Sequence, residues 1–546
     1  MAGSLRAVFV SFLALFIFSS SLSANTSVAG AGFSDHVAKL AKSKLRDKAA
    51  LITLIAETKD ARVPDLFQTL LSGHLYYLKK TGLVVAIEKA ESGYWATDVL
   101  SAQALGAVGK RSVKKIGVNN ALRRQLRSYI ATFSLTSDDR GTRLGAAKAL
   151  LKTPQESFLP ILEAALVNET DTSVRNAMGV ARSAILLGSD DAKQRLAAVN
   201  GLREATDKQV MTLLEQLLLE DEAGKIAEPD ESVQLAAREV LGKLHTRARI
   251  YKVAEDLFFG ISLGSVLLLA AIGLAITFGV MGVINMAHGE MIMLGAYTTY
   301  VVQLLMPNNI GLSLVVAVPA AFLVSGLFGV IIERSVIRFL YGRPLETLLA
   351  TFGISLILQQ LVRSVFSPLN RPVITPEWMS GSWEINGMLS LTYNRLYIIF
   401  FALAVLFLLI QLLKRTFFGL QMRAVTQNRA MASSMGIRTG WVDAMTFGLG
   451  SGVAGIAGVA LSQLTNVGPN MGQSYIIDSF MVVVFGGVGN LLGTFVGAMS
   501  LGIVNKFAEP MIGAVLAKIL ILVFVILFIQ RRPRGLFALK GRFVED

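Results

Sequence analysis

The distribution of apolar residues divides the chain into two parts. From about residue 257, apolar runs of membrane length follow one another almost to the C-terminus. Residues 25–250 instead mix charged side chains with Leu, Val and Ala at helical spacing. A helix needs about 20 mainly apolar residues to cross a bilayer. The pattern therefore predicts an all-α protein, with an α-helical soluble domain at 25–250 and a polytopic membrane domain at 251–535.

The apolar runs predict about eight or nine membrane spans. Two of the runs, 477–489 and 491–506, are short and rich in glycine, which is typical of half-helices. The candidate spans are 257–277, 280–304, 311–332, 346–366, 395–413, 441–464, 477–489, 491–506 and 512–530.

The first 24 residues have the pattern of an export signal. Arg6 precedes a 12-residue apolar core at 7–18, and small residues follow as far as Ala24. This order of residues is typical of a cleaved signal peptide, and the core is short for a span. An uncleaved anchor helix is the alternative, and both interpretations place residues 25–250 outside the cytoplasm.

Basic residues between the apolar runs predict the orientation of the spans. The net charge is +14, and the loops 333–343 and 414–438 with the C-terminal tail hold thirteen Lys and Arg. The alternate loops hold only Arg371. Because cytoplasmic loops are enriched in Lys and Arg, the basic loops and the tail 536–546 should be cytoplasmic and residues 25–250 periplasmic. No aromatic–basic motif points to nucleic acid as a partner.

The soluble half contains four similar helical stretches, in which Ala alternates with Leu or Val. Ala197 and Ala236 are 39 residues apart, which is near the period of HEAT-like helix pairs. Asp171 and Asp230 are placed to cap helices. An irregular α-helical bundle is the alternative interpretation. The four stretches are 143–151, 174–186, 195–205 and 233–244.

Two apolar stretches, 279–297 and 482–499, combine glycines with polar residues. A helix break frees backbone groups that lipid cannot satisfy, so such breaks are expected where they face protein or a polar path. Close helix packing is the alternative role for the glycines. The candidate translocation-path residues are Asn285, His288, Gly289, Glu290, Gly486, Gly487, Gly489 and Asn490.

A third stretch, residues 418–441, is a basic loop predicted to form a short helix that ends at Gly436. Such a helix can dock into a groove of a soluble partner or lie on anionic lipid. The chain has no cysteine and no G-x-x-x-x-G-K-[ST] phosphate loop. We therefore expect no thiol chemistry and no ATP hydrolysis by that route, and we predict no catalytic residue, metal site or cofactor.

Three motifs in order resemble the permease subunits of ABC importers of the branched-chain amino acid class, over about residues 255–535. They are NMAHGE at 285–290, GGVGN at 486–490 and the loop from Arg423 to Ile437. In that family the loop couples to the ATP-binding subunit, which implies the same role for matching positions here. The implied coupling residues are Arg423, Ala424, Arg429, Ala432, Gly436 and Ile437.

Within that family, the export signal and the helical extension resemble the urea importer permease, as do residues 114–126 and 257–297. The resemblance implies a bacterial inner-membrane subunit that forms a path for urea. The implied partners are a second homologous permease, two cytoplasmic ATP-binding subunits, a periplasmic urea-binding protein and membrane lipid. Branched-chain amino acids or short-chain amides are alternative cargoes, and a membrane-anchored scaffold or sensor is an alternative of another class.

Overall fold

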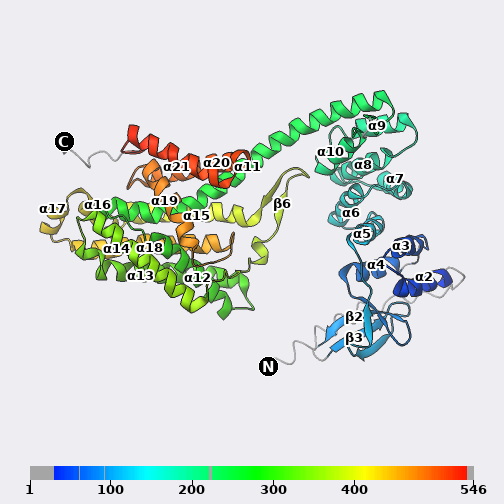
Figure 1. Ribbon diagram of the computed structural model, residues 1–546, viewed down its shortest axis with the longest axis horizontal. Coiled ribbons are helices and arrows are strands. Elements are labelled where there is room, and N and C mark those ends of the chain that lie inside the picture. Colours follow the sequence, from blue (N-terminus) through cyan, green and yellow to red (C-terminus); the bar gives the residue numbers. More distant parts are fainter. Residues whose placement is uncertain (1–29, 59, 61, 91–92, 221–223, 538–546) are drawn as a thin grey trace. The chain divides into compact units, whose positions relative to one another are not determined.

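The structure is a computed structural model that describes residues 30–537 except 59, 61, 91–92 and 221–223 (Figure 1). The predicted signal peptide at 1–24 and most of the predicted tail at 536–546 lie outside the described residues. The chain divides into two compact units, Met1–His245 and Thr246–Asp546.

The first unit begins with three helices and a five-stranded antiparallel sheet. The strand order is β4-β3-β2-β1-β5, with Tyr77 opposite Lys114 and Val85 opposite Asp98. The helices are α2 (Gly30–Lys42), α3 (Lys48–Glu57) and α4 (Val63–Ser72). The strands are β1 (Leu75–Leu78), β2 (Val84–Ala90), β3 (Gly93–Asp98), β4 (Ala104–Val108) and β5 (Val113–Lys115).

The sheet contradicts the prediction that the protein is all-α. The residues of β1, β2 and β3 are rich in Val, Tyr and Trp, which favour strands over helices. Val85, Ile87 and Ala96 lie buried on one face, at the alternating positions that a sheet requires. Short alternating runs of this kind were hidden by the stronger helical pattern on either side of them.

The rest of the described first unit is mainly helical, and Asp171 and Asp230 cap two of its helices as predicted. The Asp171 carboxylate accepts hydrogen bonds from the amides of Ser173 (2.9 Å) and Val174 (3.0 Å), and Asp230 does the same for Ser232 (2.9 Å) and Val233. The helices are α5 (Asn120–Ser134), α6 (Arg140–Lys152), η1 (Glu156–Phe158), α7 (Leu159–Asn168), α8 (Thr172–Leu186), α9 (Ala192–Gly201) and α10 (Lys208–Leu217).

A repeated ion pair connects these helices. Arg143 Nε lies 2.7 Å from Glu169 Oε2, and Arg195 Nη2 lies 2.8 Å from Glu228 Oε1. Both arginines follow the sequence Ser-Asp-Asp, which begins at 137 and again at 189. The two arginines are therefore 52 residues apart (195 − 143), longer than the spacing of 39 read from the alanines, whereas their partners Glu169 and Glu228 are 59 residues apart (228 − 169).

The second unit is built from helices of membrane length. Seven of its described helices are long and apolar enough to cross a membrane. The helices are α11 (Glu231–Met281, which begins in the first unit), α12 (His288–Leu305), α13 (Ile310–Ser335), η2 (Ile337–Phe339), α14 (Pro344–Phe366), η3 (Glu377–Met379), α15 (Tyr393–Arg415), α16 (Phe417–Gln427), α17 (Arg429–Ser434), α18 (Thr439–Ser462), α19 (Met471–Gly486), α20 (Leu491–Ile512) and α21 (Ala514–Arg531).

Two of the predicted spans correspond to α12 and α19, which are not among the seven helices long and apolar enough to cross a membrane. Helix α12 has 18 residues, and its first turn carries His288 and Glu290, which lower its hydropathy. Helix α19 has only 16 residues, as expected of a half-helix. Helix α20 has 22 residues and is long enough to span, so the prediction that it is a half-helix is wrong.

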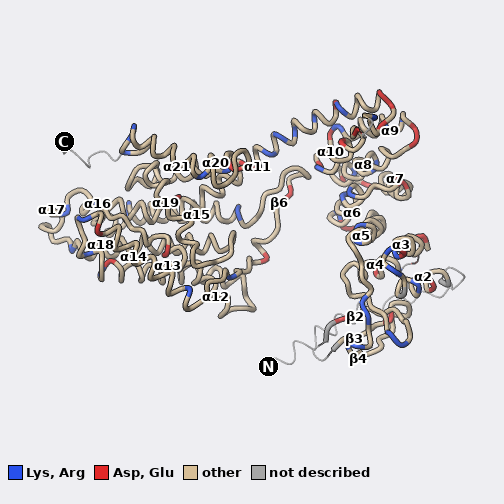
Figure 2. Tube along the Cα trace, in the orientation of Figure 1, with Lys and Arg blue, Asp and Glu red and all other residues tan. Residues whose placement is uncertain are grey.

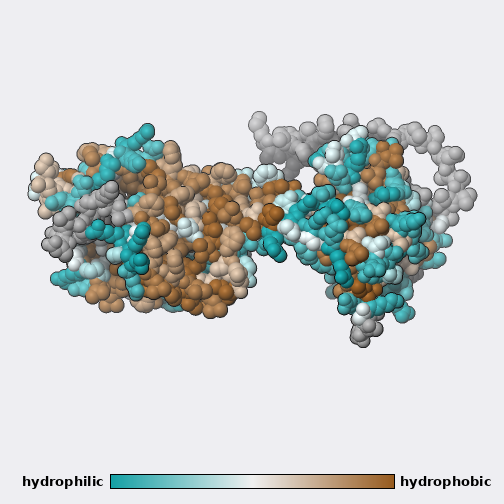
Figure 3. Space-filling view, turned by 90° about the horizontal axis from the view of Figure 1, so that it is seen from above, coloured by the Kyte–Doolittle hydropathy of each residue, from teal (hydrophilic) through white to brown (hydrophobic). Residues whose placement is uncertain are grey.

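The charged residues of the second unit gather at its ends. Lys and Arg lie around α16 and α17, and few charged residues lie along the helices between the two ends (Figure 2). Apolar side chains cover most of the visible surface of this unit, whereas the first unit is largely hydrophilic (Figure 3). The hairpin of β6 (Ser382–Glu384) and β7 (Ser390–Thr392) lies at the end opposite to α17 (Figure 1).

Candidate functional site

The helical structure is interrupted between α11 and α12, within the stretch 279–297 that combines glycines with polar residues. Gly282 has a φ of +68°, which a residue with a side chain rarely adopts. The Asn285 side chain is buried, and its Oδ1 accepts a hydrogen bond from the Ala287 amide (3.0 Å). The Met286 amide donates to Thr351 Oγ1 on α14 (3.1 Å). Side chains therefore replace part of the hydrogen bonding that the break removes.

The two ionisable residues of this stretch contact different helices. His288 Nε2 lies 2.8 Å from the Ala270 carbonyl on α11. Glu290 Oε1 accepts hydrogen bonds from Ser355 Oγ (2.9 Å) and Gln359 Nε2 (2.7 Å) on α14. The two side chains do not form a paired acid–base site, in agreement with their spacing of two residues.

Four polar atoms near this break are buried without a hydrogen-bond partner among the described residues. They belong to three side chains at the break and to one two turns further along α12. The atoms are Asn285 Nδ2, His288 Nδ1, Glu290 Oε2 and Tyr297 Oη. We call these four side chains the buried polar set. An unpaired buried polar group costs about 1–3 kcal/mol, so a cluster of them marks a place where a polar molecule can bind.

The glycines of the first stretch lie at close helix crossings. A Cβ on Gly289 would lie 2.5 Å from the Gly472 carbonyl oxygen at the start of α19. A Cβ on Gly295 would lie 2.0 Å from the Gly455 carbonyl oxygen on α18. These glycines serve helix packing, which the sequence left open as an alternative to lining a path.

The second glycine stretch forms the connection between α19 and α20. Gly487 and Gly489 have φ values of +109° and +79°. Asn490 Oδ1 accepts hydrogen bonds from the amides of Leu492 (3.1 Å) and Gly493 (3.2 Å) and so begins α20. A Cβ on Gly486 would lie 2.3 Å from the Gly493 carbonyl oxygen, so this glycine also packs against backbone.

The NMAHGE and GGVGN segments occupy different depths of the membrane unit, although Gly279, which precedes the first segment, lies at Gly489, where an added Cβ would be 2.5 Å from the Gly489 Cα. Gly289 packs at Gly472 near the start of α19, whereas Gly486 ends the same helix. The 14-residue separation along α19 corresponds to about 21 Å at 1.5 Å per residue. The structure therefore does not bring the NMAHGE and GGVGN residues into one site.

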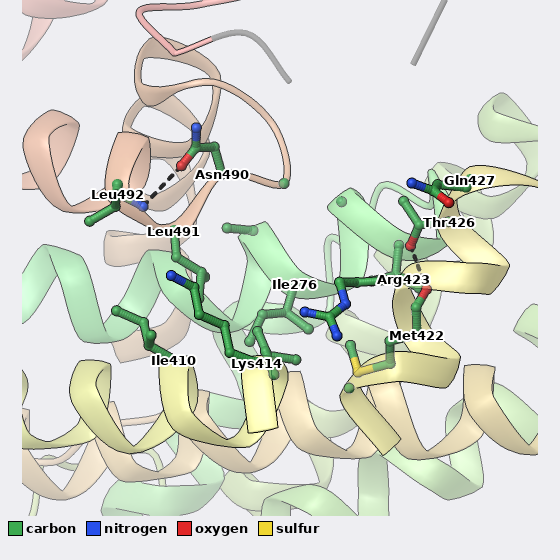
Figure 4. Close-up of a pocket in the computed structure, with 16 residues that line it drawn as sticks. Ile276, Ile410, Lys414, Met422, Arg423, Thr426, Gln427, Asn490, Leu491 and Leu492 are labelled. Carbon is green, nitrogen blue, oxygen red and sulfur yellow. Dashed lines mark hydrogen bonds between the residues drawn. The ribbon is translucent and has the colours of Figure 1, made fainter. Parts of the chain in front are cut away.

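The GGVGN segment instead borders a cavity of about 650 Å³ at the basic end of the unit. Lys414 at the end of α15 and Arg423 on α16 extend toward the space beside α11 and the start of α20, where Asn490 lies (Figure 4). Gly489 also lines this cavity. The sequence predicts separate functions for Arg423 and Asn490, whereas in the structure both residues line the same cavity.

The predicted loop helix is two helices joined at Asn428. Asn428 Oδ1 accepts a hydrogen bond from the Met431 amide (2.9 Å) and so begins α17. The Arg429 guanidinium forms a two-pronged ion pair with the buried Asp443 carboxylate on α18 and stacks 3.9 Å from the centre of the Tyr341 ring. Arg429 therefore ties α17 to a core helix rather than facing solvent.

The other predicted coupling residues have distinct surroundings. Gly436 follows α17 with a φ of +86°, so it ends that helix as predicted. The Ala432 side chain is 5% exposed, and Ala424 and Ile437 are partly buried against the same core. Met431 and Met435, which were not predicted as site residues, are 61% and 76% exposed. The face of α17 open to a partner is thus the methionine face.

Ser355, Gln359, Lys414 and Asp443 are the other site residues that sequence reasoning missed. Thr351, Ser355 and Gln359 follow one another at four-residue spacing, which places polar groups on one face of an apolar helix. That spacing was a signal for α14. Among the described residues, no three His, Asp or Glu side chains are grouped so as to hold a metal ion.

Comparison with known proteins assigns the membrane unit to a family. Residues 257–529 match the family described as "Branched-chain amino acid transport system / permease component". This match covers half of the chain, and the chain belongs to this family of permeases.

Curated relatives carry the same description. The chain is 29% identical to the high-affinity branched-chain amino acid transport system permease protein BraD of Pseudomonas aeruginosa over 296 residues, 53% of this chain and 96% of BraD. It is 30% identical to the corresponding protein LivH of Salmonella typhimurium over 292 residues, 52% of this chain and 94% of LivH. No solved structure matches the chain.

About half of this chain already matches 94–96% of the length of these relatives. The relatives are therefore too short to contain a further module of the size of residues 25–250. The extension is therefore an addition to the permease fold that these relatives share.

Proposed function

We propose that this chain is a permease subunit of an ATP-driven importer and that it contributes to the path of a small polar solute across the bacterial inner membrane. The observation that carries this proposal is the buried polar set at the break between α11 and α12. Polar groups without partners inside a membrane unit are costly, and they mark transport paths more often than packing sites.

The buried polar set offers complementary hydrogen-bonding groups. Glu290 Oε2 accepts hydrogen bonds, and Asn285 Nδ2 donates them. A solute with N–H groups and a carbonyl or carboxylate oxygen would satisfy both. Movement of α14 relative to α12 would open access, because Ser355 and Gln359 close over the Glu290 carboxylate.

Helices α16 and α17 are proposed to receive the motion of ATP-binding subunits in the cytoplasm. The exposed methionines of α17 suit an apolar groove on a partner. The Arg429–Asp443 pair would transmit displacement of α17 to α18, which packs along α12 and α13. A second homologous permease and a periplasmic solute-binding protein would complete the assembly.

Two cargoes are supported by different observations. The names of the relatives favour branched-chain amino acids. Urea is favoured by the extension, which these relatives leave no room for.

An uptake assay in a strain that lacks this chain tests the proposal. The complemented strain should accumulate labelled leucine or labelled urea, and each unlabelled solute should be used as a competitor. Uptake of leucine without competition by urea supports the first cargo, and the converse result supports the second. If deletion of the gene reduces neither leucine uptake nor urea uptake, both cargoes are wrong.

The helices from α5 to α10 are proposed to form a HEAT-like stack that stabilises the assembly or docks the solute-binding protein. Support comes from the two Arg–Glu ion pairs, whose arginines recur after 52 residues, and from the continuous apolar core that these helices share.

A further inference from the structure

A second cavity of about 380 Å³ lies between α13, α15 and α18, at the end of the membrane unit opposite to the basic loops. Its walls come from the first turns of α13 and α15, the last turn of α18 and the short helix η3. The described residues that line it are Leu314, Val315, Val318, Pro319, Trp378, Met379, Tyr397, Ile398, Phe401, Val459, Ala460 and Gln463. None of them is charged.

One polar atom in this cavity, the carboxamide oxygen of Gln463, lacks a hydrogen-bond partner among the described residues. Gln463 is 6% exposed, and its Oε1 has no hydrogen-bond partner among the described residues, while its Nε2 donates to Ser462 Oγ (3.2 Å). The wall of the apolar cavity therefore presents one hydrogen-bond acceptor without a partner among the described residues, Gln463 Oε1.

Aromatic residues stand beside the cavity at the ends of the helices. The rings of Trp378 and Tyr397 pack edge to face, with centroids 5.0 Å apart, and both side chains are partly exposed. Trp and Tyr concentrate where membrane-spanning segments meet the headgroup region. This places the cavity just inside the hydrocarbon boundary, where an acyl chain enters from the side of its own headgroup.

We propose that this cavity binds the acyl chain of a membrane phosphatidylethanolamine, with the Gln463 carboxamide oxygen accepting a hydrogen bond from the ammonium of the headgroup. The apolar lining excludes a charged or strongly polar solute, and it lies apart from the buried polar set. Phosphatidylethanolamine meets both features, since it joins long apolar chains to a hydrogen-bond donor at one end. The inference is independent of which solute the protein transports.

Quenching of Trp378 by brominated phosphatidylethanolamine in nanodiscs of phosphatidylcholine tests this inference on the full chain. Trp95, Trp383 and Trp441 are changed to Phe so that Trp378 is the remaining tryptophan. We expect quenching greater than the bulk fraction of brominated lipid predicts, because phosphatidylcholine has no headgroup donor for Gln463 Oε1 and competes poorly for the cavity.

Two variants fill the cavity from different helices, Val318→Phe and Ala460→Phe. Either one should abolish the excess quenching without lowering the Tm of the protein by more than a few degrees. The control Leu327→Phe adds the same ring to an exposed position on α13 outside the cavity and should retain the excess. Using two variants keeps the test valid if one of them fails to fold.

Quenching that follows the bulk lipid fraction in the parent protein would overturn the proposal. Trp378 that is shielded from brominated lipid would do the same, since it would mean that a protein helix covers the cavity. Excess quenching that survives both cavity-filling variants would place the bound chain elsewhere and would also overturn it.

Discussion

At the scale of single residues, the buried polar set distinguishes this membrane unit from a packed helical anchor. Thr299 and Thr277 are also buried and polar, but each hydroxyl bonds to a carbonyl of its own helix. Glu290 Oε2 and Asn285 Nδ2 have no such partner among the described residues. Local hydrogen bonding thus accounts for these two threonines and does not account for the unpaired atoms of the buried polar set.

Glu290→Gln is expected to reduce uptake per assembled complex by about tenfold, because it replaces one acceptor oxygen with a donor that the solute cannot use. Uptake should be measured in vesicles and divided by the amount of assembled complex. Thr299→Val is the matched control on the same helix and should leave this ratio unchanged. An unchanged ratio for Glu290→Gln would remove this carboxylate from the transport path.

Arg429→Ala is expected to lower the stability of the subunit by about 3 kcal/mol, because it leaves the Asp443 carboxylate buried without its partner. Thermal unfolding in detergent measures this loss. The double variant Arg429→Ala with Asp443→Ala should recover part of the stability while transport stays uncoupled. A double variant no more stable than the single one would show that the cost does not come from the unpaired charge.

At the scale of elements, helix α17 presents one face to the protein and another to its surroundings. Ala432 lies inside, and Met431 and Met435 lie outside. The sequence pattern of small and apolar residues suggested a docking helix but did not say which residues face the partner.

Met435→Asp should therefore weaken binding of the ATP-binding subunits while the Tm of the permease subunit stays the same. Ala432→Asp should instead lower the Tm, because it buries a carboxylate without a partner. Co-purification of the ATP-binding subunits and thermal unfolding of the permease distinguish the two effects. Normal co-purification with Met435→Asp would contradict the assignment of the methionine face.

The ion pair between α6 and the α7–α8 turn makes the stability of the first unit depend on pH. The Arg143 guanidinium, with the amide of Asp171, holds the pKa of Glu169 below its usual value of about 4.3. A carboxyl group with a lowered folded pKa contributes stability above its unfolded pKa, and that contribution is lost as pH falls through the folded value. Stability should therefore decrease below about pH 4.3.

Unfolding of the first unit between pH 7 and pH 3 checks this expectation, with a fluorophore on a single introduced cysteine as the probe. Glu169→Gln should remove part of the acid sensitivity. Glu163→Gln is the control, because Glu163 forms an exposed pair with Arg182. Equal acid profiles for the parent and Glu169→Gln would show that this ion pair does not set the acid limit.

At the scale of the whole molecule, we predict the topology from the distribution of basic residues. In the structure, the loops that contain Arg338 and Arg429 come together, with Arg429 stacked on Tyr341. The backbone amides of Leu536 and Phe537 bond to the carbonyls of Phe485 and Gly486, which places the chain near its C-terminus beside the GGVGN segment.

Labelling of single cysteines in intact cells tests this topology, since the native chain has no cysteine. Lys114→Cys should react with a membrane-impermeant maleimide in intact cells, whereas Arg438→Cys should react only after lysis. Both positions are exposed in the structure, so accessibility within the fold does not separate them. The reverse labelling pattern would place the first unit in the cytoplasm.

The sequence by itself determined the features that depend on local composition. Apolar run length defined most of the membrane helices, and glycines combined with polar residues located the breaks at 282–287 and 487–490. The aspartate caps and the end of α17 at Gly436 also followed from single-residue preferences. These properties are local, because a few neighbouring residues decide the backbone conformation and the hydropathy.

Only the tertiary structure decided which residues meet. Glu290 pairs with α14 across 65 residues of sequence, and Arg423 and Asn490 share a cavity although three helices, α17, α18 and α19, lie between them in the chain. The sequence did not predict the sheet at 75–115, because the alternation of apolar and polar residues in its strands is short and because pairing between strands distant in sequence stabilises it. Contacts of this kind depend on how helices and strands pack in space, which a periodic pattern along one element does not specify.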